Sequence, residues 1–298
     1  MPDFKGICVP ICTPFDASGG AVDEGKLRSH TDAMLEAGIH AILSCGGTGE
    51  FAYLREDERR NVTRIVIEQV RGRVPVIAQT SAISTRETIE NSRAAQDMGA
   101  AGIMVLPPYF EGPTMDGVRY HYEHIARAVD LPIIVYNIPQ HSNIDITPEI
   151  FRQLLQIDNI QYIKDSTASL IRIQELVATG GKVFNGGDPI AFQGMLAGSV
   201  GCIWGAANAM PREAVELYEH VAAGRLKEAL ALWRRMVAAQ LFFWNHAYNP
   251  SIKAAAAVLG RDLGLCRKPQ LPLTDAEAKR LRQALAGLHP ELERAAAE

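Results

Sequence analysis

The stretch Ile160-Gln161-Tyr162-Ile163-Lys164-Asp165 shows the pattern that organises this chain, a short β-rich run that ends in polar residues. Seven further runs of this kind lie at 6–13, 40–46, 75–80, 102–107, 132–138, 182–186 and 201–206. Amphipathic stretches separate the runs, among them 23–37, 55–71, 85–98, 114–129 and 147–156. Helix-capping residues open several of these stretches, such as Ser84 or Thr85 and Thr147.

Alternating strands and helices of this kind predict an α/β fold, and eight β/α units predict a (β/α)8 TIM barrel. An open, doubly wound sheet is the alternative. Residues 224–298 carry no strand signal and predict three further helices, at 225–246, 250–260 and 274–288. We therefore expect a barrel over residues 1–223 and a C-terminal helical extension over residues 224–298 that packs against it.

Composition excludes several classes of protein. The chain has 298 residues, of which 47% are hydrophobic and 21% charged, as in ordinary globular proteins. Its formal net charge of −4, without a basic block, argues against a nucleic-acid partner. The five cysteines are irregularly spaced, so we expect reduced thiols rather than disulfides or a zinc site. Without a signal-peptide profile or a membrane-length apolar run, we expect a soluble, cytoplasmic protein with no membrane partner.

Lys164 is the most informative single residue. Strand alternation places it on the same face as Tyr162, and an ammonium in such a strand is costly to desolvate unless it is paired or loses its proton. A buried lysine with a lowered pKa is a nucleophilic amine that forms Schiff bases with ketones. The alternative is a strand-end lysine that pairs with Asp165 or reaches water.

Tyr136 lies near the end of the preceding strand run, on the face shared with Ile134 that we assign to the barrel interior. Because these two strands are neighbours in a barrel, Tyr136 and Lys164 can approach each other. A phenol beside an amine nucleophile can pass protons to and from the substrate. The alternative is a core tyrosine whose hydroxyl binds a carbonyl.

The turn Gly46-Gly47-Thr48-Gly49-Glu50 follows the second strand run. Glycines allow close approach of the backbone, and successive N–H groups can hold a small carboxylate. A plain tight turn is one alternative. Another is a nicotinamide site, because residues 47–52 fit the loose pattern G-x-G-x-x-A, although the next strand ends without the required acidic residue.

Three motifs, Gly46 to Glu50, Tyr136-Asn137-Ile138-Pro139 and Ile163-Lys164-Asp165-Ser166, resemble those of the dihydrodipicolinate synthase / N-acetylneuraminate lyase superfamily. The resemblance covers nearly the whole chain. It implies a Schiff-base-forming enzyme that acts on pyruvate or a related 2-oxo acid. It also implies a homotetramer built as a dimer of dimers, with no metal and no organic cofactor.

The resemblance assigns roles to individual residues. Lys164 matches the lysine that condenses with the keto carbon, and Tyr136 matches the tyrosine that shuttles protons. Thr48, with the backbone amides around Gly47 and Gly49, matches the grip on the pyruvate carboxylate.

Other positions concern the rest of the substrate. Ile203 matches the apolar wall near the bound keto acid. Asp188, in a motif similar to that of the sialic-acid lyase branch, would reach the hydroxyls of a sugar-like substrate. Phe110, His141 and Gly205 complete the set that we expect above C4 of the substrate.

This sequence also departs from the superfamily's patterns. Gly47 replaces a threonine of the proton relay in dihydrodipicolinate synthases, Phe110 replaces a tyrosine that crosses the dimer interface, and His141 replaces an arginine that holds the second substrate. Pro189 replaces a sugar-binding acid of the sialic-acid branch.

The departures lead us to expect a class I aldolase or lyase that cleaves, condenses or dehydrates a hydroxylated 2-oxo acid. The alternative within the same chemistry is dihydrodipicolinate synthase itself, which condenses pyruvate with aspartate semialdehyde. A hydride-transfer enzyme and a non-catalytic barrel that binds sugar acids are the alternatives from other classes.

Overall fold

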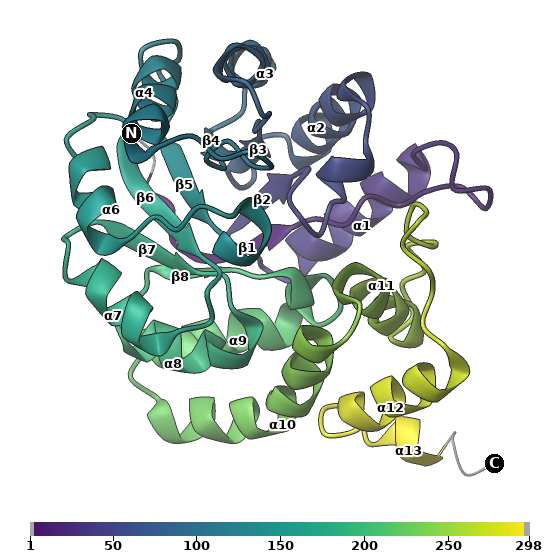
Figure 1. The fold of residues 1–298 in the computed structure, drawn as a ribbon. Coiled ribbons are helices and arrows are strands. Elements are labelled where there is room, and N and C mark those ends of the chain that lie inside the picture. Colours follow the sequence, from purple (N-terminus) through teal and green to yellow (C-terminus); the bar gives the residue numbers. More distant parts are fainter. Residues whose placement is uncertain (1–2, 295–298) are drawn as a thin grey trace.

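The computed structural model describes residues 3–294, and its centre is a closed barrel of eight parallel strands (Figure 1). Each strand pairs with its neighbours in sequence, and β8 closes the barrel against β1. The strands are β1 (Gly6–Pro10), β2 (Ala41–Ser44), β3 (Val76–Gln79), β4 (Gly102–Val105), β5 (Ile133–Asn137), β6 (Ile160–Asp165), β7 (Lys182–Asn185) and β8 (Gly201–Ile203). The predicted barrel is confirmed, and the open sheet is excluded.

Helices surround the barrel and connect successive strands (Figure 1). They are α1 (Glu24–Glu36), α2 (Glu56–Val70), α3 (Thr85–Asp97), α4 (Met115–Ala126), α6 (Pro148–Leu154), α7 (Leu170–Val177), α8 (Ala191–Leu196) and α9 (Pro211–Ala222). The side chains of Ser84 and Thr147 accept hydrogen bonds from the amides of Glu87 and Ile150, so both caps form as predicted.

Short elements that the sequence did not reveal follow several strands. They are the helix α5 (Pro139–Ser142) and the 3₁₀ turns η1 (Phe51–Tyr53), η2 (Asp188–Ile190) and η3 (Gly205–Asn208). The tail forms α10 (Leu226–Asn245), α11 (Tyr248–Val258), α12 (Asp275–Leu285) and α13 (Glu291–Arg294). The three expected tail helices are present, and α11 begins earlier than expected. No helix within residues 3–294 is long and apolar enough to cross a membrane.

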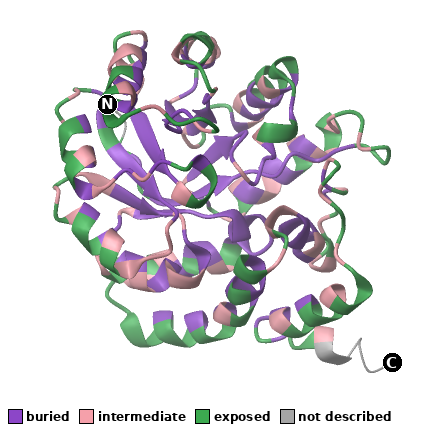
Figure 2. Ribbon diagram, viewed as in Figure 1, coloured by how far each residue is buried: buried purple, intermediate pink, exposed green. Residues whose placement is uncertain are grey.

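The core has two layers. Side chains that point into the barrel, including Ile134, Tyr136 and Tyr162, pack against one another as the strand alternation predicts. The opposite faces of the strands pack against the surrounding helices, and Figure 2 shows the strands largely buried. All five cysteines are buried free thiols.

A buried ion pair fastens the tail to the barrel mouth. Lys253 of α11 lies 2.7 Å from the Glu50 carboxylate, and its ammonium also donates hydrogen bonds to the carbonyls of Thr13 and Leu265. The side chains of Lys253 and Glu50 are 3% and 0% exposed. Because Glu50 ends the glycine turn after β2, this pair connects α11 directly to that turn.

Candidate active site

The carboxyl ends of β5 and β6 bring Tyr136 and Lys164 together. The two residues are paired in the sheet, and the Lys164 ammonium lies 4.2 Å from the centroid of the Tyr136 ring. Both are nearly buried, with exposures of 4% for Tyr136 and 6% for Lys164. Gly186, beyond the end of β7, leaves room for the lysine, since a Cβ there would lie 2.7 Å from Lys164 Cε.

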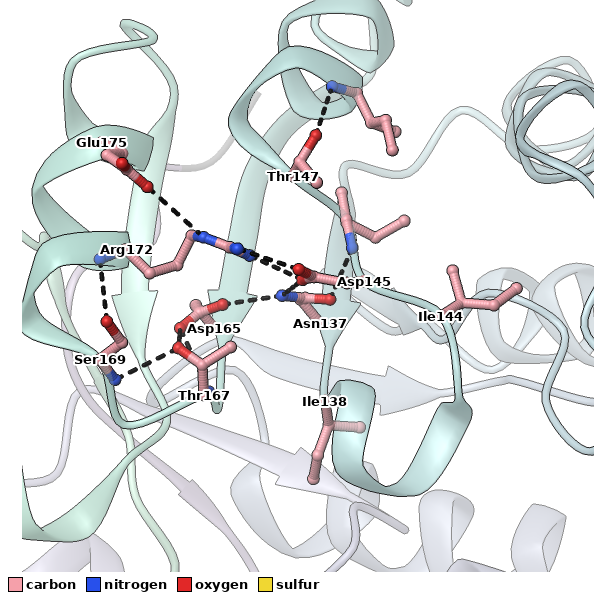
Figure 3. A network of polar contacts seen from close by, with 12 residues as sticks. Asn137, Ile138, Ile144, Asp145, Thr147, Asp165, Thr167, Ser169, Arg172 and Glu175 are labelled. Atoms are coloured by element: carbon pink, nitrogen blue, oxygen red, sulfur yellow. Dashed lines mark hydrogen bonds and ion pairs between the residues drawn. The ribbon is translucent and has the colours of Figure 1, made fainter.

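Asn137 and Asp165, the residues that follow Tyr136 and Lys164, belong to a polar network that connects the ends of β5 and β6 (Figure 3). The Asn137 amide donates hydrogen bonds of 2.8 Å to Asp165 and 3.0 Å to Asp145. Arg172 binds Asp145 through two hydrogen bonds, which lower the pKa of that carboxyl. Burial raises the pKa of Asp165, although its hydrogen bonds to Thr167 and Asn137 oppose the shift.

The glycine turn after β2 lies at the barrel mouth, where Gly47 and Thr48 line the cavity described below. The Gly47 carbonyl accepts hydrogen bonds from the Glu50 amide and the Asn249 side chain, and the Gly49 carbonyl accepts one from Thr13. Gly49 is required at its position, because a Cβ there would lie 2.9 Å from the Ile11 carbonyl oxygen. The carbonyls of Gly47 and Gly49 are therefore already bonded to groups of the protein.

A cavity of about 760 Å³ opens at this end of the barrel. Seven residues expected from the sequence line it: Gly47, Thr48, Tyr136, His141, Lys164, Ile203 and Gly205. The sequence analysis placed His141 in a loop after β5, but it belongs to the short helix α5. Other lining residues come from the tail, including Trp244, His246, Tyr248 and Asn249.

Three expected site residues do not line the cavity of their own chain. Phe110 is 77% exposed and lies outside it, and Gly49 packs against the Ile11 backbone just after β1. Asp188 is 2% exposed and lies behind Tyr248, whose hydroxyl donates a 2.7 Å hydrogen bond to it. Burial raises the pKa of Asp188 to about 7, against the opposing effects of the Tyr248 hydrogen bond and the charge of Lys164.

Tyr248 was missed by sequence reasoning. It is the first residue of α11, and no strand-end motif or glycine turn precedes it. Only the return of the tail to the barrel mouth places its side chain beside residues that lie far away in the sequence.

The structure weakens the nicotinamide hypothesis. The turn at residues 47–52 leads into the three-residue η1, whereas a dinucleotide fingerprint opens a longer helix whose N-terminus holds the pyrophosphate. Within the described residues, no group of three or more His, Cys, Asp or Glu side chains is arranged to hold a metal ion.

An amine and a phenol at the carboxyl ends of neighbouring barrel strands are the arrangement of a class I aldolase. The chain belongs to the dihydrodipicolinate synthetase family, whose model matches residues 3–288.

Individual proteins support this membership. The 4-hydroxy-tetrahydrodipicolinate synthase of Trichlorobacter lovleyi is 38% identical over 281 residues, which cover 93% of this chain and 96% of that protein. The enzyme of the same name from Pelobacter propionicus is 40% identical over 280 residues, covering 92% and 94%. The structure of the chloride-inhibited dihydrodipicolinate synthase from Acinetobacter baumannii, complexed with pyruvate, matches with a TM-score of 0.91 and 33% identity, covering 96% and 99%.

Proposed function

We propose that Lys164 forms an imine with the C2 ketone of pyruvate or a related 2-oxo acid. The observation that carries this proposal is the nearly buried amine beside Tyr136 in the wall of a cavity large enough for a small substrate. The similar structure from Acinetobacter baumannii is a complex with pyruvate, which supports a 2-oxo acid as the ligand of this cavity.

The chemistry follows from these positions. The uncharged Lys164 amine attacks C2, and loss of water gives an iminium that withdraws electrons from C3. C3 then loses a proton or releases its bond to C4, while Tyr136 transfers protons. Thr48 and the amides of the glycine turn hold the carboxylate, because the carbonyls of Gly47 and Gly49 already bind protein groups.

The names of the relatives favour one complete reaction, the condensation carried out by 4-hydroxy-tetrahydrodipicolinate synthase. They support this alternative better than the lyase reaction that the sequence departures led us to expect. On this proposal, pyruvate bound to Lys164 loses a C3 proton and the resulting enamine adds to aspartate semialdehyde.

The cavity itself favours a second candidate, a hydroxylated 2-oxo acid. Gly47 leaves the Tyr136 hydroxyl without a neighbouring hydroxyl from that position, since a Cβ there would be 3.8 Å from it. His141 lines the cavity and, unlike an arginine, cannot offer a planar fork with five donors to a second carboxylate.

One comparison of rates separates the two candidates. The purified enzyme is assayed with pyruvate plus aspartate semialdehyde and, in parallel, with a panel of keto-deoxy sugar acids. A higher kcat/KM for the condensation supports the synthase, and a higher kcat/KM for one of the sugar acids supports the lyase. No turnover of either, together with no covalent adduct on Lys164, would refute the proposal.

Assembly as a homotetramer is part of the same proposal. The exposed Phe110 side chain supports it, because the resemblance places this position at the interface of a close dimer, where a second subunit would cover the ring. Sedimentation equilibrium of the wild type and of Phe110→Lys measures the number of subunits. A wild type that stays monomeric at micromolar concentration would contradict this part.

A further inference from the structure

The pair formed by Tyr248 and Asp188 is not used by the mechanism above. Tyr248 is half-buried, lines the cavity, and directs its hydroxyl to the Asp188 carboxylate at 2.7 Å. Asp188 begins η2 just after β7, and its carboxyl is shielded from solvent. A tyrosine from the tail thus joins a buried acid of the barrel at the edge of the candidate site.

The position of this hydroxyl is fixed relative to Thr48. A Cβ built on Gly205 would collide with the Tyr248 hydroxyl and would lie 2.7 Å from Thr48 Oγ1. The two hydroxyls therefore flank the same α carbon, and both residues line the cavity. The absence of a side chain at Gly205 is what leaves room for both hydroxyls at this point of the cavity wall.

We propose that Tyr248 is a further substrate-binding residue that joins Thr48 in hydrogen-bonding the carboxylate of the 2-oxo acid, and that Asp188 positions it by taking up a proton from solvent when the carboxylate binds. This inference rests on the proposed function, since it requires a 2-oxo acid in this cavity.

The reason lies in the donors that the pair can offer. When Asp188 is ionised, the Tyr248 O–H points at it, and only oxygen lone pairs face the cavity. A substrate carboxylate then meets an acceptor, with a second negative charge behind it. When Asp188 is protonated, it donates to the Tyr248 oxygen, and the tyrosine O–H is free to donate to the substrate carboxylate.

The surroundings make this proton uptake accessible near neutral pH. Burial raises the pKa of Asp188 to about 7, and Lys164 is the charged group that acts on it from β6. Cys202 of β8 interacts with Asp188, and Tyr136 and Cys12 interact with Tyr248. Burial raises the pKa of Cys202 and of Cys12 to about 12, so neither thiol adds a negative charge beside the pair near neutral pH.

The test uses the full-length enzyme and two substitutions, Tyr248→Phe and Asp188→Asn. Adduct formation with borohydride is followed by intact mass at increasing pyruvate concentrations, from pH 6 to about 8.5, to give the half-saturating concentration. Methyl pyruvate, which has the ketone but no carboxylate, is the second probe. Tyr120→Phe, on the exposed face of α4 and away from the cavity, is the matched tyrosine control.

Three results are expected. Tyr248→Phe raises the half-saturating pyruvate concentration about tenfold at pH 6.5 and leaves that for methyl pyruvate unchanged. Relative to Asp188→Asn, the wild type needs up to about tenfold more pyruvate for each pH unit above 7. Tyr120→Phe behaves as the wild type.

Equal losses with pyruvate and methyl pyruvate in Tyr248→Phe would overturn the inference, because they would show a structural role. The inference would also be overturned if the ratio of the half-saturating pyruvate concentrations of the wild type and Asp188→Asn did not change with pH. If the wild type forms no adduct with either probe, the proposed function fails first and this inference falls with it. If the wild type forms the adduct and both variants have its half-saturating pyruvate concentration, this inference is refuted and the proposed function stands.

Discussion

Replacing Glu50 by glutamine removes the negative member of the ion pair that fastens the glycine turn to α11. The Lys253 ammonium keeps its hydrogen bonds to the carbonyls of Thr13 and Leu265, at 2.8 and 3.0 Å, but loses the carboxylate at 2.7 Å. Its side chain is only 3% exposed, so its charge stays buried without compensation. Breaking such a pair costs about 3–5 kcal/mol, and we expect Glu50→Gln near the lower end because the amide oxygen can still accept.

The substitution acts on the turn as well as on stability. The second carboxylate oxygen of Glu50 accepts hydrogen bonds from the Arg267 amide and the Gln270 side chain, and a glutamine would turn its NH2 group toward one of these donor sets. Because Glu50 follows Thr48 and Gly49 directly, we also expect a higher half-saturating concentration of pyruvate in the borohydride assay.

Urea unfolding at a fixed protein concentration measures the free energy of unfolding. The control is Glu24→Gln, which breaks a pair with Arg28 that also has a separation of 2.7 Å but is exposed, so we expect a loss of about 0.5 kcal/mol. The double variant Glu50→Gln/Lys253→Met should regain only part of the lost stability, since no buried charge is left but the carbonyls of Thr13 and Leu265 lose their donor. A loss below about 1 kcal/mol for Glu50→Gln would refute the reasoning.

Three further predictions concern the catalytic pair, the network behind it and a buried histidine. Tyr136→Phe should lower kcat by about 10²–10⁴ because proton transfer loses its hydroxyl, and steady-state rates within twofold of the wild type would contradict this role. Asn137→Ala should cost about 2–3 kcal/mol in urea unfolding, since Asp165 loses a buried partner, and an unchanged midpoint would contradict it. Burial lowers the pKa of His30 to about 4, below its unfolded value, so stability should fall between about pH 6.5 and pH 4, by about 1.4 kcal/mol per pH unit. His30→Asn should reduce this slope without abolishing it, because burial also lowers the pKa of His121 to about 4, whereas the control His124→Asn should keep the full slope.

Much of the fold could be predicted from the sequence because each strand and helix carries its own local pattern. The run from Ile160 to Asp165 alternates with a period of two, and Thr147 marks the start of a helix through its side-chain cap. Barrel closure then makes β5 and β6 neighbours, which is enough to bring Tyr136 beside Lys164. These steps need only short-range patterns and one topological rule.

The remainder depends on contacts between distant segments. Tyr248 meets Asp188 and Thr48 only because α10 and α11 return across the barrel mouth, and nothing in the residues around Tyr248 encodes that path. The Glu50–Lys253 pair has the same origin. Phe110 follows a strand end and was expected near the substrate, but its side chain is exposed outside the cavity of its own chain.

The central claim is that the Lys164 amine forms an imine with a 2-oxo acid, and peptide mapping after borohydride reduction in the presence of pyruvate tests it most directly. Lys182→Arg is the matched control. The Lys182 ammonium also lies close to a tyrosine ring, 5.1 Å from the Tyr162 centroid, but Lys182 is at the start of β7, at the opposite end of the barrel from Lys164. We predict a single reduced pyruvyl adduct on the peptide that contains Lys164, retained in Lys182→Arg and absent in Lys164→Arg. An adduct on another lysine, or none in the wild type, would contradict the account.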